Sequence, residues 1–203
     1  MASLNQNRRL SLAATIPMIT DPESNAQIKS ILLMTKIVEA DVSFHSFAEA
    51  EGDKNLALLG VDLEGKDHMR VFSFLDIVRF LHSSERWDFN LASVEPTMAL
   101  MLKSYDSSDE RNFLKFLVKA IEKKEYLFFD DGAEITKLSG PTIADLVGYF
   151  LVLDLYIMNL PVPVQDWKDR IENHYWTKMQ EVNQIFQNQI RNHKNVGEVE
   201  NSV

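Results

Sequence analysis

The sequence predicts two structural parts, an α/β half over residues 1–84 and an all-helical half over residues 85–190. Before residue 84, short strand-like runs alternate with helical periodicity in the order β, α, β, β, β, α. After residue 84, the apolar residues recur only at helical spacing. A length of 203 residues is enough for one large domain or two small ones.

The elements of the N-terminal half follow from local patterns. We expect strands over residues 9–16, 42–48, 56–61 and 69–72, with a turn over 62–67 that makes the last two a hairpin. One helix begins at Asp21-Pro22, where Asp suits the N-cap and Pro the first helical position. Another begins at Ser73, because Ser73 and Asp76 have the spacing of a capping box.

The C-terminal half is expected to contain helices joined by loops. We expect helices over residues 93–105, 110–123 and 143–160, with one or two more after the prolines at 161 and 163. Pro96 is expected in the first turn of its helix, where proline is tolerated. The tail over residues 191–203 lacks periodicity and is expected to have no regular structure.

The strongest local signal is the stretch from Gly140 to Leu146. Thr142 and Asp145 have the spacing of a capping box, in which the Thr hydroxyl accepts from the Asp N–H and the carboxylate accepts from the Thr N–H. Pro141 and Leu146 occupy the positions of a hydrophobic staple. A positive φ at Gly140 would suit a sharp turn into the helix. These features fix where the helix begins and assign Thr142 and Asp145 a structural role.

The helix that follows is predicted to be a core helix. The run from residue 143 to residue 160 is apolar, interrupted by Asp145, Gly148, Asp154 and Asn159. A helix that is apolar all round is either buried or membrane-spanning. Two carboxylates within the run favour the core, so we expect no membrane span.

Composition excludes several classes of function. The chain has no Cys, which rules out disulfides and thiolate chemistry, and a formal net charge of −9, which argues against direct nucleic-acid binding. The polar start of the chain lacks the apolar core of a signal peptide. The five His residues show no metal-binding spacing, and no phosphate loop or nucleophile elbow is found. We expect no metal, no cofactor, no catalytic residue and a soluble, cytoplasmic protein.

Three stretches resemble the glutathione-S-transferase-like (GST-like) family. The sequence around Thr142-Ile143-Ala144-Asp145 looks like the capping box and staple that begin the family's core helix. The stretch Lys119–Leu127 resembles the approach to that helix, and Asp76–Leu81 looks like the helix after the hairpin. The resemblance covers roughly residues 9–190. It implies a thioredoxin-like N-terminal half, degenerate in this chain, and the family's all-helical C-terminal half.

The sequence departs from the glutathione-binding members of this family. Those members carry a proline before the third strand, but this chain has none between Pro22 and Pro96. They also place a Glu/Gln-Ser pair at the start of the helix after the hairpin. Here Phe72 precedes Ser73, and Phe74 falls at the Ser position. The first 41 residues hold no catalytic Tyr or Cys.

The resemblance therefore implies one of the family's non-catalytic branches. These are the GST-like domains of aminoacyl-tRNA synthetases, of their accessory proteins and of elongation factor 1 subunits, which pair with other GST-like domains as homodimers or heterodimers. One of their interfaces uses the helices that flank the domain boundary, and another uses the edge of the core helix. The position that resembles the Arg–Asp contact of the second interface is Asp154.

Alternatives remain open at each candidate residue. Asp154 could contact a partner, reach solvent, or pair internally with Arg79 or Arg170, and Arg79 is a second candidate interface residue. Ser73 could be a helix N-cap or a remnant glutathione contact. The alternative function is a divergent glutathione transferase that conjugates glutathione to electrophiles, with Ser11, Thr15 or Thr20 supplying the hydroxyl.

Overall fold

The computed structural model describes residues 8–47, 56–62, 68–82, 91–105, 110–122, 125–127, 140–155, 157 and 159–200. The chain divides into two compact units. Unit 1 comprises Met1–Asp21, Ile31–Ser84 and Thr177–Val203, and unit 2 comprises Pro22–Ser30 and Glu85–Trp176. The predicted turn over 62–67 and the connections around residues 106–109 and 128–139 lie largely outside the described residues.

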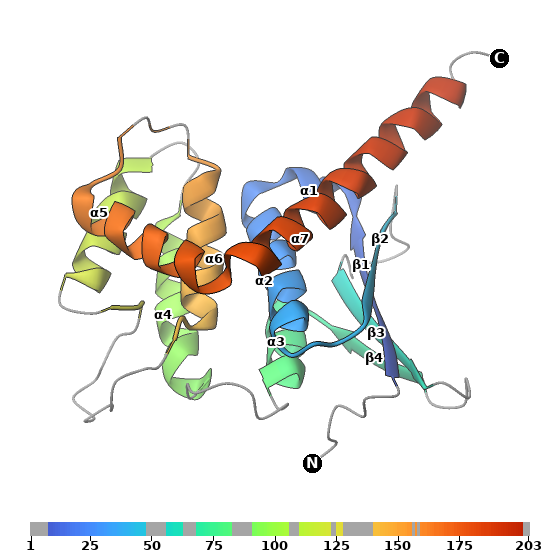
Figure 1. The fold of residues 1–203 in the computed structure, drawn as a ribbon, viewed down its shortest axis with the longest axis horizontal. Coiled ribbons are helices and arrows are strands. Elements are labelled where there is room, and N and C mark those ends of the chain that lie inside the picture. Colours follow the sequence, from blue (N-terminus) through green and yellow to red (C-terminus); the bar gives the residue numbers. More distant parts are fainter. Residues whose placement is uncertain are drawn as a thin grey trace. The chain divides into compact units, whose positions relative to one another are not determined.

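The elements alternate in the first part of the chain and are helical afterwards, as predicted (Figure 1). The strands are β1 (Arg8–Thr15), β2 (Val42–Phe47), β3 (Leu56–Asp62) and β4 (His68–Phe72). The helices are α1 (Ile16–Thr20), α2 (Pro22–Ile37), α3 (Phe74–His82), α4 (Leu91–Ser104), α5 (Glu110–Ile121), α6 (Ile143–Leu153) and α7 (Val162–Glu200).

Unit 1 is built on a four-stranded sheet in the order β2-β1-β3-β4. β1 pairs in parallel with β2, with Leu10 opposite Val42, and antiparallel with β3. β3 and β4 form the predicted antiparallel hairpin, and α3 packs against both. A parallel pair requires a crossover connection, which here contains α2. The predicted α/β character of the N-terminal half is confirmed.

The last part of α7 contributes to the core of unit 1. Phe186 of α7 stacks on Phe44 of β2, with ring centroids 5.8 Å apart. Gln189 donates its side-chain N–H to the carbonyl oxygen of Phe44 at 2.7 Å. A salt bridge of 3.3 Å joins Lys36 of α2 to Glu181. Through these contacts the segment Thr177–Val203 belongs to unit 1, although it lies more than 100 residues after the strands in the sequence.

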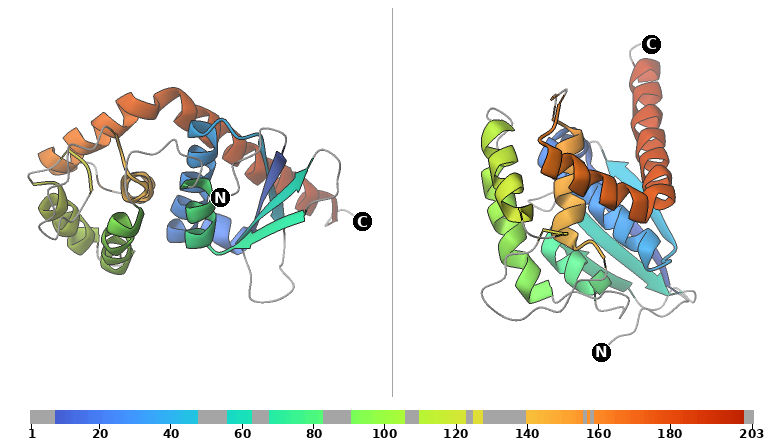
Figure 2. Two further views of the ribbon diagram at one scale, coloured as in Figure 1. Left: turned by 90° about the horizontal axis from the view of Figure 1, so that it is seen from below. Right: turned by 60° about the vertical axis from the view of Figure 1, so that its left-hand side comes forward.

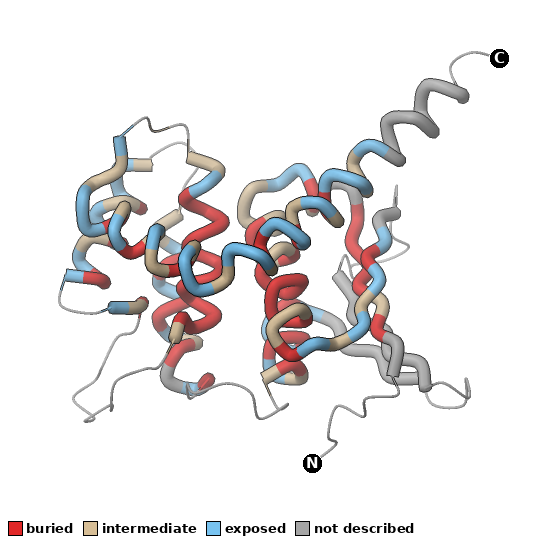
Figure 3. The backbone as a smooth tube through the Cα atoms, in the orientation of Figure 1, coloured by how far each residue is buried: buried red, intermediate tan, exposed pale blue. Residues whose placement is uncertain are grey.

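Unit 2 is arranged around α6. Figure 2 (left) looks along α6, with α4 on one side and the first part of α7 on the other. Every residue from Ile143 to Val152 is buried, which appears in Figure 3 as a continuous red segment. The prediction of a core helix is therefore confirmed, and no helix among the described residues is both long and apolar enough to cross a membrane.

The core helix ends earlier than predicted. Helix α6 stops at Leu153, whereas the apolar run predicted a helix to residue 160. Asp154 is the C-cap, and its backbone N–H bonds to the carbonyl oxygen of Leu151 at 3.2 Å, which tightens and closes the last turn. Apolar content alone could not show this end, because the residues after it are also apolar.

Other boundaries also differ from the expectations. The short helix α1 was not predicted, and Pro96 lies in the second turn of α4 rather than the first. Helix α7 continues to Glu200, so residues 191–200 are helical where no regular structure was expected. A helix can extend past its apolar pattern because each added residue gains a hydrogen bond once the nucleus exists. Tyr175 interrupts α7 with non-helical angles, φ −127° and ψ 16°.

Candidate functional site

The capping box at the start of α6 is the centre of a buried hydrogen-bond network. Asp145 Oδ2 accepts from the Thr142 N–H at 2.7 Å, and the Asp145 N–H donates to Thr142 Oγ1 at 3.4 Å. Asp145 Oδ1 accepts from the backbone N–H of Leu127 at 2.6 Å and from the indole N–H of Trp167 at 2.7 Å. The carboxylate therefore ties α6 to two segments that the capping motif alone did not predict.

Asp145 is fully buried, which has an electrostatic cost. Removal from water raises its pKa from 3.8 to about 6, although the hydrogen bonds from Leu127, Trp167 and Thr142 oppose this rise. All of its described contacts are internal and none reaches the surface. The network therefore holds unit 2 together, in agreement with the structural role predicted for Thr142 and Asp145.

Gly140 differs from its predicted role. Its φ does not lie in the left-handed region. A Cβ at this position would approach the His174 ring at 3.4 Å, an ordinary contact distance. Pro141 and Leu146, the two staple positions, are both buried. The helix start therefore depends on the capping box and does not require positive φ at Gly140.

Ser73 lies at the turn that precedes α3. Its φ is +74°, a left-handed conformation that costs a non-glycine residue on the order of 1–3 kcal/mol. The Ser73 hydroxyl donates to Asp76 Oδ2 at 2.8 Å and accepts from the Asp76 N–H at 3.4 Å. A ligand carboxylate at this turn would meet the Asp76 carboxylate and would compete with it for the hydroxyl.

The residue after Ser73 is Phe74, whose side chain cannot form a hydrogen bond with a ligand. Phe74 is buried, together with Ile77, Val78 and Leu81 on the same face of α3. A buried phenyl ring supplies no donor to a peptide-like ligand. The position at which glutathione-binding proteins of the resembled family carry Ser therefore contributes to the core of unit 1.

Asp154 occupies the C-terminal end of α6, within unit 2. Its Oδ2 atom is buried and has no hydrogen-bond partner among the described residues. Burial raises the pKa of this carboxyl group, and the charge of Lys29 opposes the rise. Lys29 also lies over the ring of Phe150, 5.7 Å from its centroid. A carboxylate at a helix C-terminus is unfavourable, because the helix dipole places negative charge there.

The suggested internal partners of Asp154 are occupied elsewhere. Arg79 lies in unit 1, where its guanidinium forms an exposed salt bridge of 3.0 Å with Asp76. Arg170 donates to the carbonyl oxygen of Glu125 at 3.3 Å. The electrostatic partner of Asp154 is instead Lys29, on a helix 125 residues earlier in the chain.

The three hydroxyls considered for catalysis, those of Ser11, Thr15 and Thr20, differ in how accessible they are. Thr15 ends β1 and is 4% exposed, which leaves little access for a substrate. Ser11 lies in the middle of β1, paired on both sides by β2 and β3. Thr20 is exposed at the end of α1. No group of three or more metal-ligating side chains occurs in the part of the chain that the structure describes.

Solved structures match this architecture over most of its length. A chain from crystal structures of two binary sub-complexes of the yeast aminoacyl-tRNA synthetase complex matches with a TM-score of 0.59 and 11% identity, covering 93% of this chain and 99% of that one. A delta-class glutathione transferase of Nilaparvata lugens matches with a TM-score of 0.54 and 13% identity, covering 89% and 99%. The chain has a GST-like fold. No protein-family model and no curated protein sequence matches it.

Another GST-like neighbour was solved with bound glutathione. A glutathione transferase homologue from Burkholderia, solved with bound glutathione, matches with a TM-score of 0.54 and 13% identity, covering 89% of this chain and 98% of that one. At such identities the comparison establishes the GST-like fold and leaves the activity open.

The network of Asp145 with Leu127 and Trp167 was missed by sequence reasoning, because its members lie 18 and 22 residues apart.

Proposed function

We propose that this chain is a non-catalytic GST-like adaptor that mediates protein–protein interaction in a translation-associated assembly. The observation that carries the proposal is the buried Phe74 at the position where glutathione-binding relatives place Ser. The missing proline before β3 and the Ser73–Asp76 contact support it further. The likeness to a chain of the yeast aminoacyl-tRNA synthetase complex suggests the type of assembly.

The adaptor would contact other GST-like domains through two kinds of surface. On α3, Leu75 and Arg79 are both exposed and lie four residues apart, so they share a face of that helix. On α6, Leu153 is 42% exposed and precedes Asp154. Asp154 is half-buried, so its exposed part could accept hydrogen bonds from an Arg of a partner. We therefore propose Asp154 and Arg79 as interface residues, in a homodimer or a heterodimer.

Affinity capture from the source cell tests this proposal. The full chain is immobilised, and the captured proteins are identified by mass spectrometry. We expect aminoacyl-tRNA synthetases or elongation factor subunits that contain GST-like domains, and a cytoplasmic origin of the complex. Replacing Asp154 with Arg should reduce that capture, whereas Asp166→Arg, an exposed position on α7, should not. Failure to recover any translation factor would overturn the proposal.

The second candidate is a divergent glutathione transferase, which the transferase neighbours favour. Its activating hydroxyl would come from Ser11, Thr15 or Thr20. Thr20 is the exposed one, and the buried Thr15 would need the end of β1 to open. Alanine substitution of each residue decides this mechanism: conjugation that survives all three changes shows that none of them activates glutathione.

A further inference from the structure

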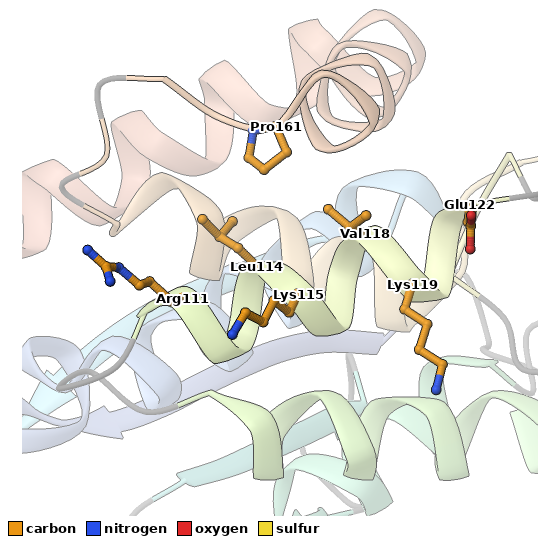
Figure 4. A pocket seen from close by; sticks show the side chains of 7 residues that line it. All are labelled: Arg111, Leu114, Lys115, Val118, Lys119, Glu122 and Pro161. Carbon is orange, nitrogen blue, oxygen red and sulfur yellow. The ribbon is translucent and has the colours of Figure 1, made fainter.

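An open groove runs along one flank of α5 in unit 2. Its volume is about 450 Å³. Leu114 and Val118 point from α5 toward Pro161, which precedes α7 (Figure 4). All three are partly exposed. The adjoining face of α5 is buried in the unit through Phe113, Leu117, Ala120 and Ile121. Leu114 and Val118 therefore extend the apolar face of α5 to the surface.

A row of cations borders this strip. Arg111, Lys115 and Lys119 are exposed and four residues apart, so they lie on one side of α5, about 6 Å apart along its axis. Figure 4 shows Lys115 and Lys119 directed away from Pro161. None of the three has an ion-pair partner within the described part of the chain, and Glu122 is the one acidic residue that lines the groove. This strip is locally positive although the chain has a net charge of −9.

We propose that this groove docks an acidic amphipathic helix of a partner protein. The helix would place aliphatic side chains against Leu114, Val118 and Pro161, and Asp or Glu side chains against the cations. The strip runs along a single helix and combines apolar with charged side chains. Amphipathic helices bind in grooves of this kind through their apolar face. This inference rests on the proposed adaptor function, for which it names a docking surface and the chemistry of its occupant.

A nucleic acid fits the groove less well than an acidic helix. Single-stranded nucleic acids are bound by aromatic side chains that stack on the bases, combined with a long positive channel. Among the described residues, the apolar members of the groove lining are Leu114, Val118 and Pro161, and none of the described lining residues is aromatic. Charge complementarity therefore points to carboxylates beside aliphatic groups rather than to phosphates beside bases.

Fluorescence anisotropy with a synthetic probe tests the groove. The probe is a labelled helical peptide of about four turns, with Glu at every fourth position beside a row of Leu. The full chain should bind it, and a peptide with Lys in place of each Glu should bind at least about tenfold more weakly. Lys115→Glu and Lys119→Glu should each raise the Kd about fivefold. Val118→Ser should weaken binding without any change of charge.

Lys103→Glu is the matched control, because Lys103 is also exposed in unit 2 but lies on α4 outside the groove. It should leave the Kd within about twofold of the unsubstituted chain. Three results would overturn the inference: no binding of the acidic peptide, equal effects of Lys115→Glu and Lys103→Glu, or tighter binding of a single-stranded RNA through the same lysines. Partner capture is a separate measurement. If no translation factor is captured but the acidic peptide still binds, the adaptor function is wrong and the assignment of the groove is retained.

Discussion

Trp167 and Asp145 form a buried contact that joins two helices of unit 2. The indole N–H of Trp167, on α7, donates to Asp145 Oδ1, on α6, at 2.7 Å, and both side chains are completely buried. A buried carboxylate that loses one of its donors retains its desolvation cost without compensation. The contact is therefore expected to contribute to the stability of the unit.

Trp167→Phe removes this donor and preserves most of the ring. We expect a loss of about 1.5–3 kcal/mol in the free energy of unfolding, because a hydrogen bond to a charged group is lost in the core. Trp176→Phe is the control: Trp176 is 56% exposed, and its replacement should change stability by less than about 0.5 kcal/mol. Equal effects of the two substitutions in chemical denaturation would show that the Asp145 contact is unimportant.

The pKa of Asp145 predicts a pH dependence. Burial raises this pKa to about 6 from an ordinary 3.8, so the folded state binds the proton more tightly than the unfolded state. The corresponding stabilisation is present below about pH 4 and is lost as the pH rises through about 6, on the order of 3 kcal/mol in total.

Comparison with Asp145→Asn isolates this effect, because the amide does not titrate in this range. The difference in unfolding free energy between the two proteins should change between pH 4 and pH 7, with the unsubstituted chain losing stability relative to the variant as the pH rises. A difference that is constant over this range would contradict the raised pKa.

Gly148 allows the close approach of α6 to its neighbours. A Cβ at this position would lie 2.9 Å from Met101 Sδ, 3.1 Å from Leu127 Cδ1 and 3.3 Å from the Trp167 ring. Overpacking typically costs about 1–3 kcal/mol, and the higher helix propensity of alanine returns about 1 kcal/mol. We therefore expect Gly148→Ala to lower the unfolding free energy by about 1 kcal/mol.

Gly140→Ala is the corresponding control. Its Cβ would meet His174 at 3.4 Å, and its φ is accessible to alanine, so we expect a change below about 0.5 kcal/mol. Thermal unfolding of both variants measures the contrast. If Gly148→Ala proves as stable as Gly140→Ala, the neighbouring side chains move aside without cost, and the packing argument is wrong.

Asp154 is predicted to matter more for association than for folding. Asp154→Asn removes a carboxylate from a helix C-terminus, where negative charge is unfavourable, so stability should be unchanged or rise by up to about 1 kcal/mol. If Asp154 is an interface residue, the same substitution weakens partner binding. Sedimentation or light scattering measures association, and Asp166→Asn serves as control. A substitution that destabilises the fold and leaves association intact would assign Asp154 a purely structural role.

Local signals in the sequence predicted the parts of the fold that depend on neighbouring residues. The Thr142–Asp145 capping box was predictable because its two members are three residues apart, and the alternation of strands and helices showed the α/β half. The sequence places Phe74 at the position of the resembled family's Ser, and the structure adds that its side chain is buried.

Features that depend on long-range packing were not predictable. The contact of Asp145 with Trp167 spans 22 residues, and the proximity of Lys29 to Asp154 spans much of the chain. The spacing of Lys115 and Lys119 is visible in the sequence, but the groove also requires Pro161, which the fold brings to α5. Sequence periodicity carries no information about such pairings.

Glutathione titration followed by a conjugation assay on the full chain tests the central claim most directly. The buried Phe74 and the Ser73–Asp76 contact predict no saturable heat with glutathione in isothermal calorimetry, and no turnover of an electrophilic substrate above the uncatalysed rate. Micromolar glutathione binding together with measurable conjugation would contradict the assignment of a non-catalytic adaptor.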